Sequence, residues 1–212
     1  MAGATAASRF DAAIAAIDAA NADDPHTIVV DGVERPKEQA HAEMMTAWVL
    51  RLDPDADEAQ LLAARAHHLR RWTSPRSDYP AGRAGYLRWR TALKARHAEE
   101  VGQLLEASGY DRTTIERVQA IVRKDRLRTD PATQTHEDAL CLTFLETQLA
   151  GVGEQLGEDR TVEVVRRTWA KMSPRGRQAA RGLHLAPTPR ELLRRAVATD
   201  DHGSSSSGPA GR

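Results

Sequence analysis

The stretch from Leu61 to His97 concentrates residue types that bind ions and carry out acid–base chemistry. It holds three of the eight histidines, two of the four tryptophans and two of the three tyrosines. It also holds nine basic residues against a single acid, Asp78. Imidazole and guanidinium groups together suit a pocket that binds an anion and, through the imidazoles, a metal ion. The stretch therefore predicts a polar pocket for an anionic ligand, with a metal ion as a second component.

Candidate metal ligands lie on separate predicted helices. Helical bundles build metal centres from carboxylates and imidazoles that project inward from facing helices. Such nitrogen and oxygen donors suit Mn²⁺, Fe²⁺ or Zn²⁺. The predicted ligands are Glu43, His68, His97 and Asp138, with Glu137 beside the last.

His67 and His68 are adjacent, so on one continuous helix their side chains point about 100° apart. Of the two we expect His68 at the ion, because its face also carries Leu61 and Trp72. The remaining histidines of the first 140 residues, namely His26, His41 and His136, are expected on the surface.

A second constellation is basic. Guanidinium groups match the geometry of phosphate and carboxylate, and a lysine adds a point charge. The residues expected to hold an anion are Arg71, Arg76, Arg90 and Lys124. The aromatic residues of the same stretch either stack on a ring of the ligand or pack the loop between two helices: Trp72, Tyr79, Tyr86 and Trp89.

Several function classes lack their sequence signals. There is no P-loop, no dinucleotide-binding glycine motif and no nucleophile elbow. Thirty basic and thirty acidic residues cancel, which argues against a general nucleic-acid binder. No uninterrupted apolar run approaches the ~20 residues that span a bilayer, so we expect no membrane partner. The single cysteine, Cys141, suits a reducing compartment and a cytoplasmic location.

The elements that must position these residues are helices. Apolar residues recur at helical spacing over most of the chain, and only the segment from His26 to Pro36 has a β-branched run around an Asp-Gly turn signal. That segment predicts at most one minor β-hairpin. Helices are expected over residues 5–21, 36–52, 55–72, 82–107, 112–125, 131–149 and 160–172, with two more opening at Pro174 and Pro189.

These elements predict an all-α protein, a single-domain orthogonal bundle of about eight to nine helices. The domain is expected to span residues 1–199. The Gly- and Ser-rich tail, residues 200–212, has the composition of a disordered segment.

The chain resembles the domain of unknown function family 4202. The similar segments are FDAAIAAIDAAN, EMMTAW, LAARAHHLRRW, RAGYLRWR, KDRLRTD, HEDALCLTFLE and TWAKMS, between residue 10 and about residue 185. A pattern Ala-x-His-x-x-Arg-Trp falls on Ala66, His68, Arg71 and Trp72. The resemblance also includes Glu43, Arg76, Tyr86, Trp89, Arg90, His97, Lys124, Glu137 and Asp138. The sequence departs from the family pattern at His67 and His41, so neither is expected as a ligand.

The order of polar residues is also similar, more distantly, to HD-type metal phosphohydrolases, which are all-α and hold ions with His and Asp from separate helices. The doublet that names them is absent, since Leu69 follows His68. The resulting hypothesis is an HD-like, metal-dependent hydrolase of a small phosphorylated or otherwise anionic substrate, such as a nucleotide or phosphoester. The ion would activate water, and Arg71, Arg76, Arg90, Lys124 and Glu137 would act on the substrate.

Two alternatives stay open. Carboxylate and histidine ligands in a bundle also serve iron oxidases. The basic and aromatic cluster also suits a non-enzymatic module that binds RNA, a nucleotide or an acidic protein segment, and salt-sensitive binding without a metal would favour that reading.

Overall fold

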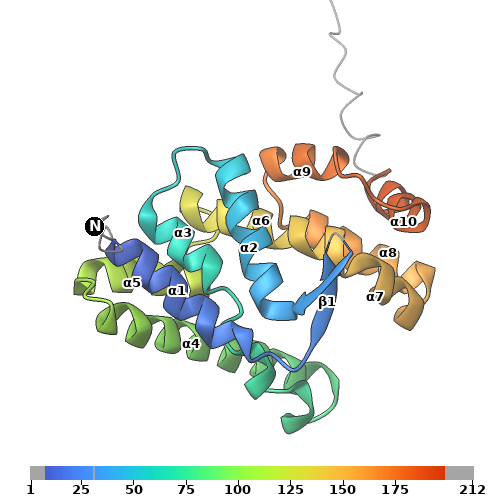
Figure 1. The fold of residues 1–212 in the computed structure, drawn as a ribbon. Helices are drawn as coiled ribbons and strands as arrows, with labels where there is room; N and C mark the ends of the chain where they lie inside the picture. The colour runs from blue at the N-terminus through green and yellow to red at the C-terminus, as the bar shows by residue number, and fades with distance from the viewer. Residues whose placement is uncertain (1–7, 31, 199–212) are drawn as a thin grey trace, which may run out of the picture. The chain divides into compact units, whose positions relative to one another are not determined.

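The computed structural model describes residues 8–30 and 32–198, and within them the chain is helical (Figure 1). It contains ten α-helices, two short 3-10 helices and one two-stranded antiparallel hairpin. The prediction of an all-α protein with at most one minor hairpin is confirmed. The number of helices exceeds the expected eight to nine, in part because α7 (Leu149–Leu156) forms a separate helix after α6 (Pro131–Thr147).

The chain divides into two compact units, Met1–Ala139 and Leu140–Arg212, and the boundary falls within α6. The prediction of one domain over residues 1–199 stays a prediction. The tail over residues 200–212, predicted to be disordered, lies outside the described residues. No helix among residues 8–30 and 32–198 is long and apolar enough to cross a membrane.

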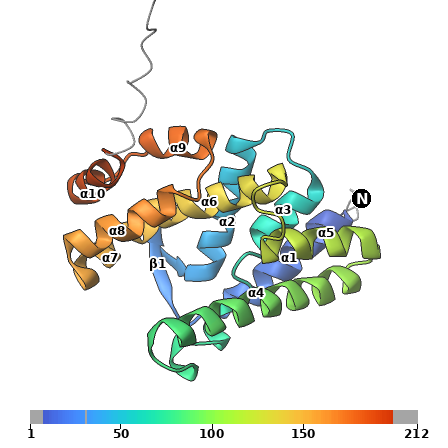
Figure 2. The same ribbon diagram turned by 180° about the vertical axis from the view of Figure 1, so that it is seen from behind.

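The first unit contains the hairpin and the helices that carry the candidate residues. In chain order its elements are α1 (Arg9–Ala22), β1 (Thr27–Val30), β2 (Val33–Pro36), α2 (Lys37–Leu52), α3 (Glu58–Arg65), η1 (Arg71–Thr73), η2 (Arg76–Asp78), α4 (Gly82–Ala107), α5 (Arg112–Arg123) and the start of α6. β1 and β2 pair directly, with Val30 opposite Val33. Figures 1 and 2 show α1, α3, α4 and α5 packed side by side.

The core of this unit is aliphatic and small. Ile17 of α1, Leu62 of α3, Val101 of α4 and Ile121 of α5 are fully buried in one cluster. Burial of each such side chain contributes about 1.5–3 kcal/mol. These contacts fix the helices whose polar faces carry the candidate site.

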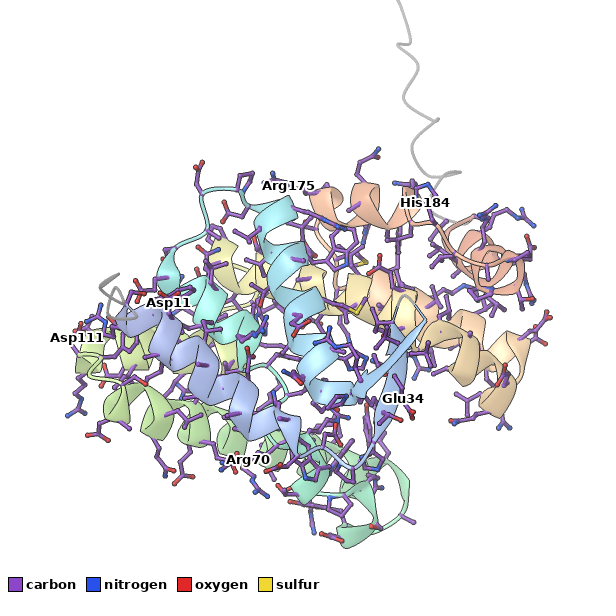
Figure 3. The ribbon with its side chains drawn as sticks, viewed as in Figure 1. Asp11, Glu34, Arg70, Asp111, Arg175 and His184 are labelled. Atoms are coloured by element: carbon purple, nitrogen blue, oxygen red, sulfur yellow. The ribbon has the colours of Figure 1, made fainter. Side chains whose placement is uncertain are left out.

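The third helix differs from its prediction at both ends. It begins at an Asp57–Gln60 capping box, two residues after the predicted start at Asp55, and it ends at Arg65 instead of Trp72. The chain then turns, and Arg70 adopts a left-handed conformation with φ 49°. The Asn21 side chain accepts the Arg70 N–H at 3.0 Å, and Figure 3 shows the labelled Arg70 near the end of α1. A contact from α1 therefore stabilises the turn, and the predicted helical face of Leu61, His68 and Trp72 does not form.

The second unit contains α7, α8 (Glu158–Trp169), α9 (Pro174–Arg181) and α10 (Pro187–Val197). Val162 and Val165 of α8 and Leu192 of α10 are buried, and the two helices pack together. Ser173 caps α9 by accepting the Gly176 N–H at 3.1 Å, as expected for a Ser-Pro helix start.

Candidate metal centre

Three side chains of the first unit form a group that could hold a metal ion. Glu38 and His41 lie on α2, and His68 lies in the turn after α3. Each offers one ligand atom, and these atoms all lie within 4.8 Å of one another. The Glu38 Oε2 atom lies 2.9 Å from His68 Nδ1 and 3.7 Å from His41 Nδ1. Glu38 and His41 are buried, and the His68 side chain is 17 % exposed.

The start of α2 places Glu38 in this group. The Asp24 carboxylate accepts the Glu38 N–H at 3.0 Å and so satisfies one of the unpaired N–H groups at this end of the helix. Glu38 and His41 are three residues apart and therefore share one helix face. Burial alone would raise the pKa of Glu38, but the charge interaction with His68 and hydrogen bonds from His41 and His68 outweigh it and lower that pKa. The carboxylate is thus ionised at neutral pH.

The partners of His68 define its tautomer. Its Nε2 atom lies 2.9 Å from Arg71 Nη1, and a guanidinium can only donate, so Nε2 is the acceptor. The proton consequently lies on Nδ1, which donates to Glu38. Burial lowers the pKa of His68 to about 4 despite the Glu38 carboxylate. His68 is therefore neutral at pH 7, which is the form that binds metals.

Three further histidines lie close to this group. The rings of His67 and His68 lie 4.2 Å apart between centroids, and those of His68 and His97 lie 6.0 Å apart. His67 Nδ1 also lies 2.8 Å from His136 Nε2. The expectation that His67 points away from His68 fails because helix α3 ends before them. His41 and His136, predicted on the surface, are 3 % and 1 % exposed and thus buried, whereas His26 is exposed.

These histidines have ring nitrogens that the folded chain leaves without a partner. Among the described residues, His67 Nε2, His97 Nε2 and His136 Nδ1 are buried and form no hydrogen bond. The His97 ring donates to the His67 backbone, so its Nε2 atom carries a free lone pair. Burial lowers the pKa of His97 and of His136 to about 3, and that of His67 well below its usual value. Unpartnered buried nitrogens are costly to the fold and typical of a binding site.

Lys124, Glu137 and Asp138 lie in the same unit. Lys124 has φ 62° at the end of α5, is buried and pairs with the buried Glu137. Burial is the main cause of the low pKa values of His67 and His136, and the positive charge of Lys124 lowers them further. Asp138 accepts a hydrogen bond from Gln134 at 3.0 Å. The predicted nearness of Lys124 and Glu137 to the histidines is therefore present, while Asp138 is not part of the three-residue group.

Glu43 has a different environment from the one predicted. It binds Arg35 through two hydrogen bonds of 2.6 and 2.7 Å. Arg65 lies 3.5 Å from the same carboxylate and itself binds Asp18 at 2.5 and 2.6 Å. Glu43 is not part of the three-residue group, and it links β2 and α2 to α3.

The basic residues divide between two roles. Arg71 remains beside the metal group, because its guanidinium contacts His68 at 2.9 Å and lies 5.1 Å from the Trp89 ring. Arg90 lies farther out, with its guanidinium 5.9 Å from the Tyr86 ring. Arg76 donates instead to the backbone carbonyls of Tyr79, Pro80 and Gly82. Arg76 thus holds the loop together.

A family model described as "Domain of unknown function (DUF4202)" matches residues 11–193. The chain belongs to this family. The resemblance read from the sequence is thereby confirmed over nearly the whole described chain. No curated protein and no solved structure matches the DUF4202 chain. The more distant similarity to HD-type phosphohydrolases stays a prediction.

Sequence reasoning missed Glu38, His41 and His136. A signal for the first two exists in the segment KEQAH, because Glu38 and His41 form a Glu-x-x-His pair. That spacing places a carboxylate and an imidazole on one helix face, as in carboxylate-bridged metal bundles. His136 has no comparable local signal, since its partner His67 lies 69 positions away.

Proposed function

We propose that this DUF4202 protein is a metal-dependent hydrolase of a small phosphorylated compound, with the ion held by Glu38, His41 and His68. The observation that carries the proposal is the convergence of three ligand atoms, two of them from histidines, beside Arg71, which forms no ion pair with a carboxylate in the described part of the chain. Of the ligands expected from sequence, this set keeps His68. Glu38 and His41 take the places of Glu43 and Asp138.

The geometry of the group fits a small divalent ion. In a tetrahedral zinc site the ligand atoms lie about 3.3 Å from one another, given bonds of about 2.0–2.1 Å. The Glu38 oxygen lies 2.9 and 3.7 Å from the two histidine nitrogens, on either side of that value. One oxygen and two nitrogens suit Mn²⁺, Fe²⁺ or Zn²⁺. Three protein ligands leave a position for water, as catalytic sites do.

His97 is the fourth candidate ligand. Its Nε2 atom is buried and unpartnered, and its ring lies 6.0 Å from that of His68. His97 would either ligate the ion through that lone pair or accept a hydrogen bond there from a water bound to the ion. Both roles retain the sequence-based expectation that His97 belongs to the site.

An ion held by Glu38, His41 and His68 would lower the pKa of a bound water, which would make that water a nucleophile for phosphorus near neutral pH. The attack forms a P–O bond and breaks the bond to the leaving alcohol, which takes up a proton. Arg71 and Arg90 bind the phosphate oxygens and stabilise the charge that develops on them. Lys124 and Glu137 hold the buried side of the histidine cluster.

Arg71 changes its partner when the ion binds. His68 cannot ligate through Nδ1 while that atom carries the proton. Once Nδ1 binds the ion, the neutral ring carries its proton on Nε2, which then opposes the N–H of Arg71. The bond between Arg71 and His68 is therefore incompatible with metal on Nδ1. Metal binding releases Arg71 for the anionic substrate, so the ion and the anion should favour each other's binding.

The proposal is tested by measuring Mn²⁺, Fe²⁺ and Zn²⁺ affinities together with release of phosphate from a generic aryl phosphate. His41→Ala and His68→Ala should lose both metal binding and turnover and should keep their circular dichroism. His184→Ala is the matched control, because His184 is exposed in the second unit (Figure 3). Normal metal affinity in His68→Ala would overturn the assignment. Oxygen consumption on adding Fe²⁺, without phosphate release, would point instead to the iron oxidase alternative.

A further inference from the structure

We infer that the substrate is a phosphate ester that carries a planar ring, of the nucleotide class, with the ring on Tyr86 and the phosphate at Arg71 and Arg90. This inference rests on the proposed function and names the substrate class of that site. The inference assigns ligand binding to Tyr86, a residue that takes no part in the proposed hydrolysis.

One face of α4 leads from the surface to the metal group. Tyr86, Trp89 and Arg90 are spaced three and four residues apart and so lie on one side of the helix. The same face continues to the buried Leu93 and His97. Tyr86 is 42 % exposed, and its ring lies 5.9 Å from that of Trp89. An exposed aromatic ring thus lies at the outer end of a stripe whose inner end is the histidine cluster.

The contacts along this stripe are continuous. His68 Nε2 lies 2.9 Å from Arg71, the Arg71 guanidinium lies 5.1 Å from the Trp89 ring, and Trp89 contacts Tyr86. Tyr86 and Arg90 are separated by about 6 Å along the helix axis. A phosphate held by Arg90 therefore lies about one helical turn from Tyr86, a separation that the sugar and base of a nucleotide can span.

The two arginines have the charge that a phosphate requires. Neither Arg71 nor Arg90 forms an ion pair with a carboxylate within residues 8–30 and 32–198. The Arg90 guanidinium donates to the Tyr86 hydroxyl at 3.2 Å and lies 5.9 Å from the Tyr86 ring. Burial lowers the pKa of Arg71, the Glu38 carboxylate acts against that change, and the positive charge of Arg90 adds to it, so the two guanidinium groups repel each other. A dianionic phosphate between them relieves that repulsion and matches both guanidinium forks.

The loop that borders the stripe is fixed before any ligand binds. Arg76 holds three carbonyls of the loop, and Trp89 donates from its ring nitrogen to the Ser74 carbonyl at 2.9 Å. Gly85 faces the Pro80 carbonyl so closely that a Cβ atom there would lie 1.8 Å from the oxygen. Such preorganisation favours binding because little conformational freedom is lost.

The ring assignment is tested with two probes that share a phosphate and a sugar. Adenosine 5′-monophosphate carries a base, and ribose 5-phosphate does not. Dissociation constants are measured by calorimetry with and without Mn²⁺, for wild type, Tyr86→Leu and Tyr86→Phe. Leu87→Ala is the control, because Leu87 is also exposed and adjacent but lies on a different side of α4.

Base stacking on an aromatic side chain predicts that the monophosphate with a base binds roughly tenfold more tightly than ribose 5-phosphate. Tyr86→Leu should remove that difference, while Tyr86→Phe and Leu87→Ala should keep it. Equal affinity for both probes, or a difference that survives Tyr86→Leu, would overturn the ring assignment and leave the anion site intact. Failure of both probes to bind would overturn the anion site as well. Loss of Mn²⁺ binding is measured separately and bears on the metal proposal alone.

Discussion

Two charged clusters of the first unit differ in how completely their members are paired. The structural network joins Arg35, Glu43, Arg65 and Asp18 through two-pronged hydrogen bonds of 2.5–2.7 Å. The histidine cluster contains Glu38, His41, His67, His68, His97 and His136, with Arg71 at its edge. In the network two positive charges meet two negative ones. In the histidine cluster three buried ring nitrogens form no hydrogen bond with any residue that the structure describes.

The difference separates a structural role from a binding role. A network with every charge paired already satisfies its members and has nothing left to bind a ligand. A cluster of neutral imidazoles beside one ionised carboxylate keeps lone pairs available, at a cost to stability. Both clusters contain a glutamate of α2, so the same substitution can be made in each cluster. Comparing the two variants tests the distinction.

The largest expected effect is on metal affinity. Glu38→Gln keeps the shape of the side chain and removes the negative ligand, so the affinity for Mn²⁺ or Zn²⁺ should fall more than 100-fold. Glu43→Gln is the matched variant and should leave metal affinity unchanged. Calorimetric titration of both proteins measures the contrast. An equal loss in the two variants would place Glu43 in the metal site after all.

The next effect is on stability. Arg65→Ala leaves Asp18 and Glu43 without a shared partner in a mostly buried position, where the Arg65 side chain is 14 % exposed. The free energy of unfolding should fall by about 3 kcal/mol. Arg71→Ala should change it by less than about 1 kcal/mol, because among the described residues Arg71 forms no ion pair whose carboxylate would be left unpaired. Urea unfolding measures both values, and a reversal of this order would contradict the division of roles.

Acid should destabilise the fold through the neutral histidines. The pKa of His136 is lowered to about 3 by burial, so between pH 3 and 6.5 the unfolded chain binds more protons than the folded one. Stability therefore rises with pH across that window and is lost on acidification. At pH 5 each such histidine costs about 2 kcal/mol relative to pH 7. Between pH 7 and pH 5 the free energy of unfolding should fall by about 2 kcal/mol less in His136→Gln than in wild type. Urea unfolding at the two pH values measures this difference.

A smaller effect is expected at Arg71. Arg71→Ala removes the donor that competes for His68, so Mn²⁺ affinity should rise several-fold, roughly 1 kcal/mol. Phosphate should strengthen Mn²⁺ binding in wild type and no longer do so in this variant. Calorimetry with and without phosphate measures the coupling. Weaker Mn²⁺ binding in Arg71→Ala would show that Arg71 stabilises the metal-bound form, and would contradict the competition between Arg71 and the ion for His68.

The sequence predicts most helices well because the information for them is local. Pro36 and Asp53-Pro54 delimit α2, and the hairpin follows from its Asp-Gly turn. The end of α3 at Arg65 is not local, because the turn depends on Asn21, which lies 49 positions from Arg70. The apolar pattern continues at helical spacing beyond Arg65. The side-chain directions that it predicts for His67 and His68 are therefore wrong.

The same distinction between local and distant sequence information explains why only part of the candidate site could be predicted. His68, His97 and Arg71 lie in a stretch whose composition alone is unusual, so they could be found. His41 and His136 look ordinary in sequence, and their neighbours in the fold come from distant positions: His68 lies near His41, and His67 contacts His136. Sequence reasoning predicts Glu43 as a ligand and does not identify Glu38, although Glu38 forms the Glu-x-x-His pair. The arginines that bind Glu43 come from β2 and α3.

The measurement that tests the central claim most directly is anomalous X-ray diffraction from crystals of protein purified without chelator or histidine tag, at the absorption edges of Mn, Fe and Zn. We expect one anomalous peak per chain, about 2.0–2.3 Å from Glu38, His41 and His68, and its absence in Glu38→Gln crystals. A peak bound by other residues, or no peak after soaking in each of the three ions, would contradict the metal centre.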